Sequence, residues 1–454
     1  MIEISTELIK EAIYKLCFEA NTCLDDRIYS KILDAYNKTN DEILKSILQN
    51  AKIAFDKKLP LCQDTGQVIV FIEIGQNVHL TGELLENAVN SSVSKCYEEN
   101  FFRKSVVKNA VFDRANTKDN TPAIVYTKII EGNSINLSVL IKGAGSENKS
   151  KLEMMLPTSS EEEIIDKCSE LIISAGKNAC PPMFIGIGIG GTADKATLIS
   201  KEALVKENFS NEELNLAEKI KNKVNEQTSQ NYVLDVKVST TSTHIACMPV
   251  AITINCHSDR TSSCTITENK ITYNHKTPNF IEFENGNNKK QEIFVNEVEK
   301  IRNLKQGEEI LLSGKIYIAR DMAHKKLKEM LDKGENLPFD IKDSIIFYAG
   351  PCPNKDVEII GSVGPTTASR MDKYAVELYD KGLLATIGKG ERNQAVKNAI
   401  ERNNAKYFTV TGGIAALLSD KVNKKEILAF EELGAEALYS IDVEKFPVRV
   451  ELDW

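Results

Sequence analysis

Three cysteines stand in strings that also carry residue types found in catalytic sites. Cys62 lies in LPLCQDTGQ, directly before the amide of Gln63 and the carboxylate of Asp64. Cys180 lies in NACPP, where two prolines could hold its sulfur at a fixed orientation, and Cys256 lies in INCHSDR, where neighbouring cations would favour the thiolate. No pair of cysteines has C-x-x-C spacing, and free cysteines are often buried. Each thiol is therefore either a metal ligand or a packing residue.

The string GSVGPTTASRMD combines a Gly-Pro turn with the hydroxyls of Thr366 and Thr367 and the guanidinium of Arg370. If a helix begins near Thr367, its free N–H groups and Arg370 could together bind a carboxylate. A threonine-capped helix with a solvent-facing arginine would give the same pattern. The string therefore indicates either an anion site or a capped helix.

Three more polar residues lie where an anion could approach. KIYIARDMAHKK places Arg320 at a predicted strand-to-helix turn, and GKGERN places Lys389 between two glycines. THIACMP carries His244. Each residue also has an ordinary interpretation, as a surface arginine, a turn lysine and a structural histidine that only makes hydrogen bonds.

The glycine-rich string MFIGIGIGG satisfies G-x-G-x-x-G through Gly186, Gly188 and Gly191, between an apolar run and a predicted helix. A dinucleotide-binding fold would place an acidic residue about 20 positions further on, after a second strand. Here a helical stretch rich in Lys and Glu follows directly. Close backbone packing around an anionic site is therefore favoured over nucleotide binding.

The elements that would position these residues begin with a helical region. Apolar residues from Ile9 to Ala20 recur at three- and four-residue intervals, as in an amphipathic helix, and the chain is predicted to be largely helical up to residue 56. The motif around Cys62 then lies in a loop before an apolar strand, Val68–Ile74.

Further strands and helices follow in the amino-terminal half. AIVYTKII and INLSVLIKG are β-rich runs joined by residues 131–134, which predicts a β-hairpin. A capping box of Ser160 and Glu163 begins a helix that ends near Gly176. Two helical stretches are expected across 193–228, and a strand in MPVAITINC delivers Cys256 at its end.

The polar stretch KTPNFIEFENGNNKKQE, residues 276–292, has no apolar periodicity and is predicted to link two domains, 1–275 and 293–454. Beyond it, the strands IIFYAGP, LLATIGKG and ILAFEEL alternate with helices at 320–333, 372–381 and 391–402. This alternation is typical of an α/β unit with some parallel pairing. The predicted fold class is α/β, with an α+β amino-terminal part and a smaller α/β carboxyl-terminal domain.

Bulk properties exclude several classes of protein. The chain has 454 residues, 42% of them hydrophobic, and a net charge of −8 from 57 basic and 65 acidic residues, which argues against a nucleic-acid binder. No run approaches the roughly 20 apolar residues that span a bilayer. Glu and Lys interrupt the first 20 residues, unlike a signal peptide, so a cytoplasmic location is expected. Ten cysteines are too sparse for a disulfide scaffold.

Taken together and in order, the motifs resemble the class I (iron–sulfur) fumarase and tartrate dehydratase family. The strings that carry the resemblance are LPLCQDTGQ, FDRANTKDNTPA, KGAGSEN, NACPPMFIGIGIGGT, HIACMPVAITINCH, LLSGKIYIARDMAHKKL and GSVGPTTASRMD. Residues 1–275 resemble the α-type part and residues 293–454 the β-type part, with the second expected to form a swivelling-type domain that closes over the substrate. Many relatives make the two parts as separate chains, whereas here they are fused.

The resemblance implies a 4Fe-4S cluster bound by Cys62, Cys180 and Cys256, with one iron that has no protein ligand. Cys264 is a nearby rival for the third ligand, but PVAITINCH matches the family string and SSCTI does not. The other cysteines are expected to be structural: Cys17, Cys23, Cys96, Cys168, Cys247 and Cys352.

The resemblance also implies roles for the polar residues. Thr366 would remove the proton from carbon and Asp64 would protonate the departing hydroxyl group. A threonine base requires a neighbouring cation, which Arg370 or Lys389 could supply. The implied substrate-binding residues are Gln63, Arg103 from FFRKS, Gly145 from KGAGSEN, His244, Arg320, Thr367, Arg370 and Lys389.

The implied activity is that of a hydro-lyase that interconverts a small dicarboxylate and its hydroxy acid, with fumarate and (S)-malate as the leading pair. Tartrate and mesaconate are alternatives in the same family, because motifs do not report the pocket shape that distinguishes them. An oxygen-sensitive, homodimeric enzyme of the tricarboxylic acid cycle is expected. A cluster-based redox sensor and an NAD-binding oxidoreductase are the rival hypotheses.

Overall fold

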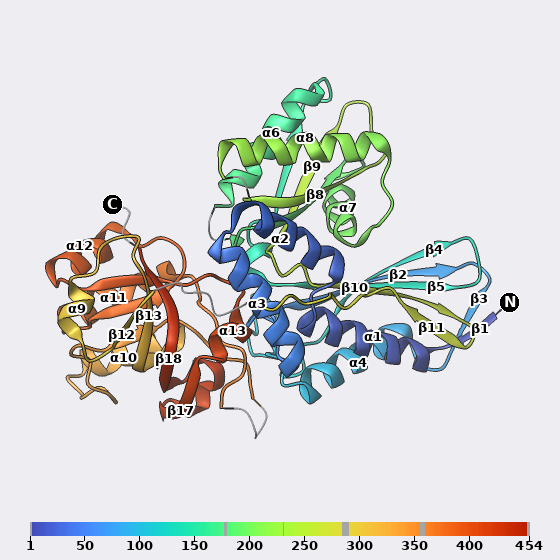
Figure 1. Ribbon diagram of the computed structural model, residues 1–454. Helices are drawn as coiled ribbons and strands as arrows, with labels where there is room; N and C mark the ends of the chain where they lie inside the picture. Colours follow the sequence, from blue (N-terminus) through green and yellow to red (C-terminus); the bar gives the residue numbers. More distant parts are fainter. Residues whose placement is uncertain (1, 177–178, 230, 284–289, 355–358, 452–454) are drawn as a thin grey trace. The chain divides into compact units, whose positions relative to one another are not determined.

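The computed structural model describes residues 2–176, 179–229, 231–283, 290–354 and 359–451, and it divides into two compact units (Figure 1). The first unit comprises Met1–Ala51 and Asp64–Phe280, and the second comprises Lys52–Gln63 and Ile281–Trp454. The division after Phe280 falls within residues 276–292, the predicted linker, of which residues 284–289 lie outside the described residues. No sequence pattern predicted that residues 52–63 would pack with the second unit.

A five-stranded sheet in the first unit has β2 (Gln67–Gly75) as an inner strand. Its order is β11 (Lys270–Tyr273), β10 (Thr261–Thr267), β5 (Ile135–Lys142), β2 and β4 (Ile124–Ile130). The predicted strand after Cys62 is therefore confirmed, and the motif lies in the loop that precedes it.

The predicted hairpin between residues 123 and 143 is wrong. β4 is parallel to β2 and β5 is antiparallel to it, so the two strands flank β2 and do not pair with each other. β2 is buried from Val68 to Phe71, and so apolar a strand is stabilised most in the interior of a sheet. The turn between β4 and β5 instead binds the end of β2, since the N–H of Gly75 donates to Ser134 O at 2.9 Å.

The first helix of the chain covers this sheet. α1 (Thr6–Thr22) begins at Ser5, whose side chain accepts a hydrogen bond from the N–H of Glu7. The predicted apolar face of α1 is buried in the same core as β2, β5 and α4 (Leu85–Glu99). α2 (Asp26–Thr39) and α3 (Glu42–Lys57) follow, so the predicted helical region is confirmed. The short strands β1 (Ile2–Ser5) and β3 (Val78–Thr81) pair in parallel.

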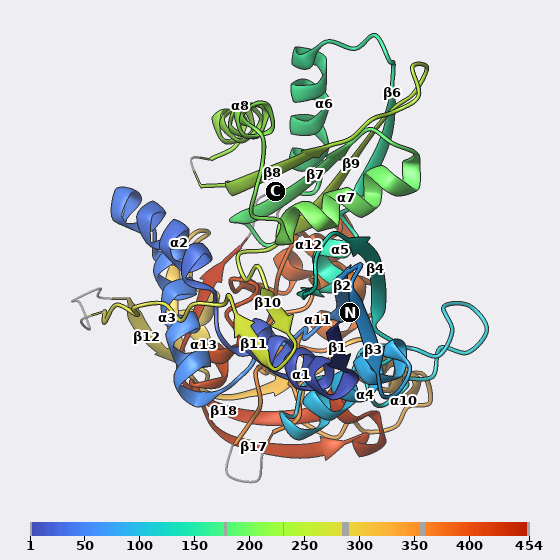
Figure 2. The ribbon, with the colours of Figure 1, turned by 90° about the vertical axis from the view of Figure 1, so that its right-hand side faces the viewer.

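A second sheet of the first unit has the order β6 (Lys151–Met155), β9 (Met248–Asn255), β7 (Met183–Ile189) and β8 (Val233–Thr240). Figure 2 shows α6 (Glu161–Ser174) and α8 (Asn211–Gln227) on one face of it and α7 (Ala193–Val205) on the other. The capping box of Ser160 and Glu163 begins α6 as predicted. β9 ends one residue before Cys256, also as predicted.

The glycine-rich string lies mainly inside β7. A Cβ atom on Gly186 or Gly188 would lie 2.1 Å from a backbone carbonyl oxygen of α7, at Ser200 or Ala196. The glycines therefore let the helix pack directly against the strand, which confirms the interpretation as close backbone packing. The first two glycines of a dinucleotide fingerprint lie in the turn after the strand, whereas Gly186 and Gly188 lie inside β7 and only Gly191 lies beyond its end.

The second unit contains a seven-stranded sheet. Its order is β12 (Gln291–Phe294), β13 (Glu309–Ile318), β14 (Ile345–Phe347), β15 (Ala385–Gly388), β16 (Lys406–Thr409), β18 (Leu438–Val450) and β17 (Val422–Ala429). β12 to β16 are parallel, and β18 is antiparallel to β13, β16 and β17. The predicted α/β unit with parallel pairing is confirmed. The ILAFEEL string differs from the prediction, because β17 ends at Ala429 and the turn η3 (Glu431–Glu436) follows.

Helices between the parallel strands match the predicted positions. They are α10 (Asp321–Asp332), α11 (Asp372–Asp380) and α12 (Gln394–Arg402). Two shorter helices, α9 (Val298–Arg302) and α13 (Ala415–Ser419), follow β12 and β16. Ligands of such sheets bind beyond the carboxyl ends of the parallel strands, because the strand-to-helix loops gather there. Arg320 follows β13 and Lys389 follows β15 at this edge. None of the helices in the described parts of the chain is long and apolar enough to cross a membrane.

Candidate active site

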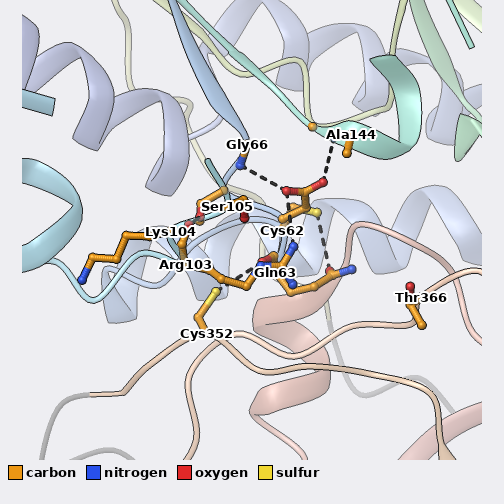
Figure 3. Close-up of polar contacts among 12 residues, drawn as sticks. Cys62, Gln63, Gly66, Arg103, Lys104, Ser105, Ala144, Cys352 and Thr366 are labelled. Carbon is orange, nitrogen blue, oxygen red and sulfur yellow. Dashed lines mark hydrogen bonds and ion pairs between the residues drawn. The ribbon is translucent and has the colours of Figure 1, made fainter. Parts of the chain in front are cut away.

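Asp64 is the centre of a polar cluster in the first unit. Its Oδ2 atom accepts a hydrogen bond from the N–H of Ala144 at 2.9 Å, and Oδ1 accepts one from the N–H of Gly66 at 3.2 Å (Figure 3). Nη2 of Arg103 lies 3.3 Å from Oδ1. Nη1 of Arg260 donates to the backbone oxygen of Asp64 at 2.5 Å. The structure thus brings together Asp64 and Arg103, two of the predicted site residues.

The loop that carries this carboxylate is held on several sides. Thr65 Oγ1 donates to the carbonyl of Arg103 at 2.6 Å, and the carbonyl of Thr65 accepts a hydrogen bond from Tyr97 OH at 2.5 Å. Asn120 Nδ2 donates to the carbonyl of Gly66 at 3.1 Å. Gly66 has φ +63°, and a Cβ there would lie 2.7 Å from the carbonyl oxygen of Lys142. The glycine of the motif is therefore required by the backbone itself.

The charge state of Asp64 follows from these contacts. Burial by itself would raise the pKa of the carboxyl group, but the charges of Arg103 and Arg260 and the N–H groups of Ala144 and Gly66 outweigh it. The net result is a pKa below the ordinary value of 3.8. At neutral pH, Asp64 is therefore a carboxylate that can accept a proton and can donate one only after it has been protonated.

Two other predicted residues of the first unit lie on exposed backbone. Gly145 is in α5 (Ala144–Glu147), the turn whose first N–H binds Asp64, and it is exposed. His244 is exposed in the loop between β8 and β9, where its Nδ1 accepts a hydrogen bond from the N–H of Ala246 at 3.1 Å. Gly145 is thus adjacent to the Asp64 cluster, and His244 presents its other ring nitrogen to solvent or ligand.

Sequence reasoning missed Lys142, which is buried two residues before this turn. Its Nζ donates to Ser146 Oγ at 3.0 Å, to Asn255 Oδ1 at 2.9 Å and to the carbonyl of Ile254. Burial lowers the pKa of this lysine to about 8. Because Asn255 directly precedes Cys256, Lys142 ties the Asp64 cluster to the loop of a predicted ligand cysteine. Lys142 is the first residue of KGAGSEN, but that string gave no sign of this contact, since Asn255 lies more than 100 positions away.

The predicted ligand cysteines occupy loops. Cys256 follows β9, and its Sγ lies 3.2 Å from Ser258 Oγ. Cys180 has φ +59° and is partly exposed, and Cys62 is 8% exposed and belongs to the second unit. All ten cysteines lie among the described residues, and none of them forms a disulfide. Within the described part of either unit, no three His, Cys, Asp or Glu side chains form a ready-made metal site, so the ligand set stays a prediction.

Most other cysteines lie in apolar surroundings. Burial raises the pKa of Cys17, Cys23, Cys168 and Cys264 to about 12. Cys264, the rival third ligand, is 1% exposed in the core beneath the five-stranded sheet. A thiolate there would be strongly disfavoured, which supports Cys256 over Cys264.

In the second unit, the segment before Asp64 packs against the loop after β14. Gln63 Nε2 donates to the carbonyl of Pro365 at 3.3 Å, and its Oε1 lies 3.5 Å from Cys62 Sγ. Cys352 Sγ donates to the carbonyl of Gln63 at 3.4 Å (Figure 3). A Cβ on Gly364 would lie 2.3 Å from Gln63 Oε1, so this glycine makes room for the amide. Gln63 is therefore held against Pro365, the residue that precedes Thr366.

Backbone hydrogen bonds join Thr366 to the ends of β14 and β15. The N–H of Thr366 donates to Tyr348 O at 2.8 Å, and the N–H of Lys389 donates to Thr366 O at 3.3 Å. Lys389 O accepts a hydrogen bond from the N–H of Ala368 at 2.9 Å. The predicted use of free helix N–H groups as a carboxylate site is wrong for Ala368, because that N–H is already paired. η2 (Ala368–Met371) is only a 3₁₀ turn, and among the described residues the Thr367 side chain makes no capping hydrogen bond to it.

The two arginines of this edge are oriented by carboxylates that sequence reasoning missed. Arg370 Nη1 donates to Thr366 Oγ1 at 2.9 Å, and its Nε donates to Asp321 Oδ1 at 3.0 Å. Arg320 Nη2 donates to Glu436 Oε1 at 2.9 Å. The structure thus gathers a hydroxyl group and three cations, Arg320, Arg370 and Lys389, at one edge of the parallel sheet. This arrangement suits a ligand with carboxylate groups.

Comparison with known proteins covers the whole chain. The family model described as "Fumarate hydratase (Fumerase)" matches residues 10–265, and the model "Fumarase C-terminus" matches residues 266–454. The chain is 31% identical to "Fumarate hydratase class I, aerobic" of Salmonella typhimurium, over 99% of this chain and 83% of that protein. It is 31% identical to "Fumarate hydratase 2" of Leishmania major, over 93% of this chain and 80% of that protein. It is 30% identical to "Fumarate hydratase class I, anaerobic" of Escherichia coli, over 99% and 88%.

Proposed function

Since this chain belongs to the fumarate hydratase family, we propose that it is a hydro-lyase that reversibly adds water to a small dicarboxylate, with fumarate and (S)-malate as its pair. The observation that carries the proposal is the edge of the parallel sheet where Arg370 and Lys389 both contact Thr366 and where Arg320 follows the end of β13. Two carboxylates on one substrate need several cations, and this edge supplies them.

The reaction requires a proton to leave a carbon atom next to a carboxylate. Its removal places extra negative charge on that carboxylate, which Arg320, Arg370 and Lys389 stabilise electrostatically. Thr366 removes the proton. Its Oγ1 accepts a hydrogen bond from the Arg370 guanidinium, and this positive charge favours the alkoxide form that a threonine base needs.

Asp64 transfers the proton between water and the hydroxyl oxygen of the substrate. As an ionised carboxylate it accepts a proton from water during hydration, and by microscopic reversibility it returns that proton to the hydroxyl group during dehydration. Arg103, with Nη2 at 3.3 Å from Asp64 Oδ1, holds the carboxylate and is a proposed ligand of a substrate carboxylate. Gln63, Gly145, His244 and Thr367 complete the proposed substrate-binding set.

Hydroxide is a poor leaving group, and the thiols of this chain fit a centre that assists it. Cys62, Cys180 and Cys256 lie in loops and form no disulfide, whereas Cys264 is enclosed in the apolar core. These three thiols would hold a 4Fe-4S cluster with one iron that has no protein ligand. When bound, such a cluster supplies a Lewis acid for the hydroxyl oxygen.

The test is anaerobic purification with reconstitution of the iron–sulfur centre, followed by hydration and dehydration assays over fumarate, malate, tartrate and mesaconate. We expect iron–sulfur absorbance and turnover of fumarate and malate above the other pairs. Turnover of only tartrate or mesaconate would keep the hydro-lyase and change its substrate. A reconstituted protein inactive on the whole panel would refute the proposal.

The same preparation tests the remaining expectations. Exposure to air should abolish activity together with the absorbance, because the proposed iron without a protein ligand is open to oxidants. Sedimentation equilibrium should give the mass of a homodimer. Saturable NAD binding, which the rival oxidoreductase requires, should be absent.

A further inference from the structure

Arg370 connects two residues that are far apart in the chain. Its Nη1 donates to Thr366 Oγ1 at 2.9 Å, while Nε and Nη2 both bind the carboxylate of Asp321, which is 29% exposed. Such a two-point pair fixes the plane of the guanidinium, because the carboxylate matches its parallel N–H groups. All three residues belong to the second unit.

The described contacts use three of the five N–H donors of Arg370. Two donors, one on each terminal nitrogen, are left to contact a substrate carboxylate. The direction of these donors and of the donor to Thr366 is set by the same plane. Asp321 therefore sets the orientation of the Arg370 guanidinium relative to the hydroxyl oxygen of Thr366.

The backbone fixes the other two corners of this arrangement. Thr366 is held between β14 and β15 through Tyr348 and Lys389, and Asp321 is the first residue of α10, directly after Arg320. Arg370 is the one long, flexible side chain among the three, and 49% of it is exposed. Without Asp321, nothing in the contacts just described would hold its guanidinium plane, and a free arginine side chain populates many rotamers.

We propose that Asp321 is a positioning residue for proton transfer, which orients Arg370 so that its charge stabilises the basic form of Thr366. The inference rests on the proposed hydro-lyase function. Asp321 itself touches no reacting atom, and its effect reaches the substrate only through Arg370 and Thr366. A surface ion pair alone would contribute little to stability, because solvent and salt screen exposed charges.

The second unit offers a matched control. Asp380 on α11 binds Arg402 of α12 in the same two-point fashion, with Nε at 2.9 Å and Nη2 at 2.5 Å from its two oxygens. Both side chains are about as exposed as Arg370. Neither contacts Thr366. Asp380→Asn therefore removes an equivalent ion pair outside the site.

The experiment compares Asp321→Asn, Asp321→Glu and Asp380→Asn in reconstituted, full-length protein, with thermal unfolding as a check on folding. We expect Asp321→Asn to lower kcat for malate dehydration about 10- to 100-fold, as loss of an outer orienting partner typically does. Malate deuterated at the carbon that loses its proton should then give a larger isotope effect, because proton removal becomes more rate-limiting. Asp380→Asn should change neither quantity, and Asp321→Glu should recover part of kcat.

A double-mutant cycle with Thr366→Ala separates positioning from general damage. In the Thr366→Ala background, Asp321→Asn should have little further effect on kcat, because the group it serves is gone. Equal losses in both backgrounds, or an Asp321→Asn protein indistinguishable from Asp380→Asn, would overturn the inference. An inactive wild-type protein would instead refute the proposed function, so the two failures are distinguishable.

Discussion

The carboxylate of Asp64 accepts the backbone N–H of Ala144 at 2.9 Å while Nη2 of Arg103 lies 3.3 Å from its other oxygen. A carboxylate held on both oxygens by donors is both oriented and ionised. The remaining lone pairs of Asp64 are then available to a proton from water.

Asp64→Asn should remove this proton acceptor. We expect kcat for fumarate hydration to fall by about 10²- to 10⁴-fold, the usual contribution of a general acid–base group. Because the N–H groups of Ala144 and Gly66 bind different oxygens of Asp64, the single amide oxygen of asparagine can accept from only one of them, so thermal unfolding should also show a loss of stability of about 1–3 kcal/mol. Initial-rate assays across substrate concentration check the prediction, and wild-type kcat in Asp64→Asn would contradict it.

Arg103→Met should move the acidic limb of the pH–rate profile for fumarate hydration, the direction in which Asp64 must be ionised. Without this guanidinium, burial acts against a weaker opposing charge, so the pKa of Asp64 rises and the limb shifts to higher pH. KM should also rise, because Arg103 is a proposed substrate ligand. Profiles of kcat/KM from about pH 4 to 8 report the shift, and an unchanged limb would exclude Asp64 as the titrating group.

Cys256→Ser and Cys264→Ala should separate the two candidate third ligands. Cys256→Ser should lose most of its iron and its activity. Cys264→Ala, a small change within the apolar core, should keep both and lose roughly 1 kcal/mol of stability. Iron analysis after reconstitution decides between them, and the reverse pattern would make Cys264 the ligand.

Stability of the second unit should fall at mildly acidic pH because of His324. Burial lowers the pKa of this histidine from 6.5 to about 4, although the carbonyl of Arg320, 3.0 Å from Nδ1, opposes the shift. The imidazole is therefore neutral in the folded state. The contribution of the neutral imidazole to the free energy of unfolding is complete above pH 6.5. It is lost as pH falls from 6.5 toward 4, by about 3 kcal/mol in all.

Denaturant unfolding of full-length protein between pH 4 and 7 measures this loss. His324→Gln should flatten that part of the curve, because no histidine is left there to take up the proton. His79→Gln, at an exposed position of the first unit, is the matched control and should keep the wild-type slope. A slope unaffected by His324→Gln would assign it to other groups.

Local patterns predicted most elements of the fold. The capping box at Ser160 and Glu163 and the apolar periodicity of α1 each depend on residues three or four positions apart, which a sequence displays directly. The hairpin of β4 and β5 failed for the opposite reason. Their true partner, β2, comes about 50 residues earlier, and no turn signal can report a strand inserted from elsewhere.

The site divides in the same way. Thr366 and Lys389 were recognisable from a hydroxyl-rich and a glycine-rich string, and Arg320 from its place at a predicted strand-to-helix turn. Asp321 and Glu436 were not, since the first binds an arginine 49 positions away and the second one 116 positions away. Such pairings are set by how strands are ordered in the sheet, which local composition does not encode.

Residues 52–63 determine how the chain would behave if it were cut into two fragments. They precede Asp64, yet Ser362 Oγ donates to Pro60 O at 2.6 Å and the N–H of Ala415 donates to Leu61 O at 3.3 Å, both within the second unit. A polypeptide cut between residues 276 and 292 would leave this segment on one fragment and the residues that bind it, Ser362 and Ala415, on the other. Residues 52–63 on the first fragment would then bind the second fragment as a peptide ligand. Association of the two fragments would report whether the second unit has recovered this missing segment.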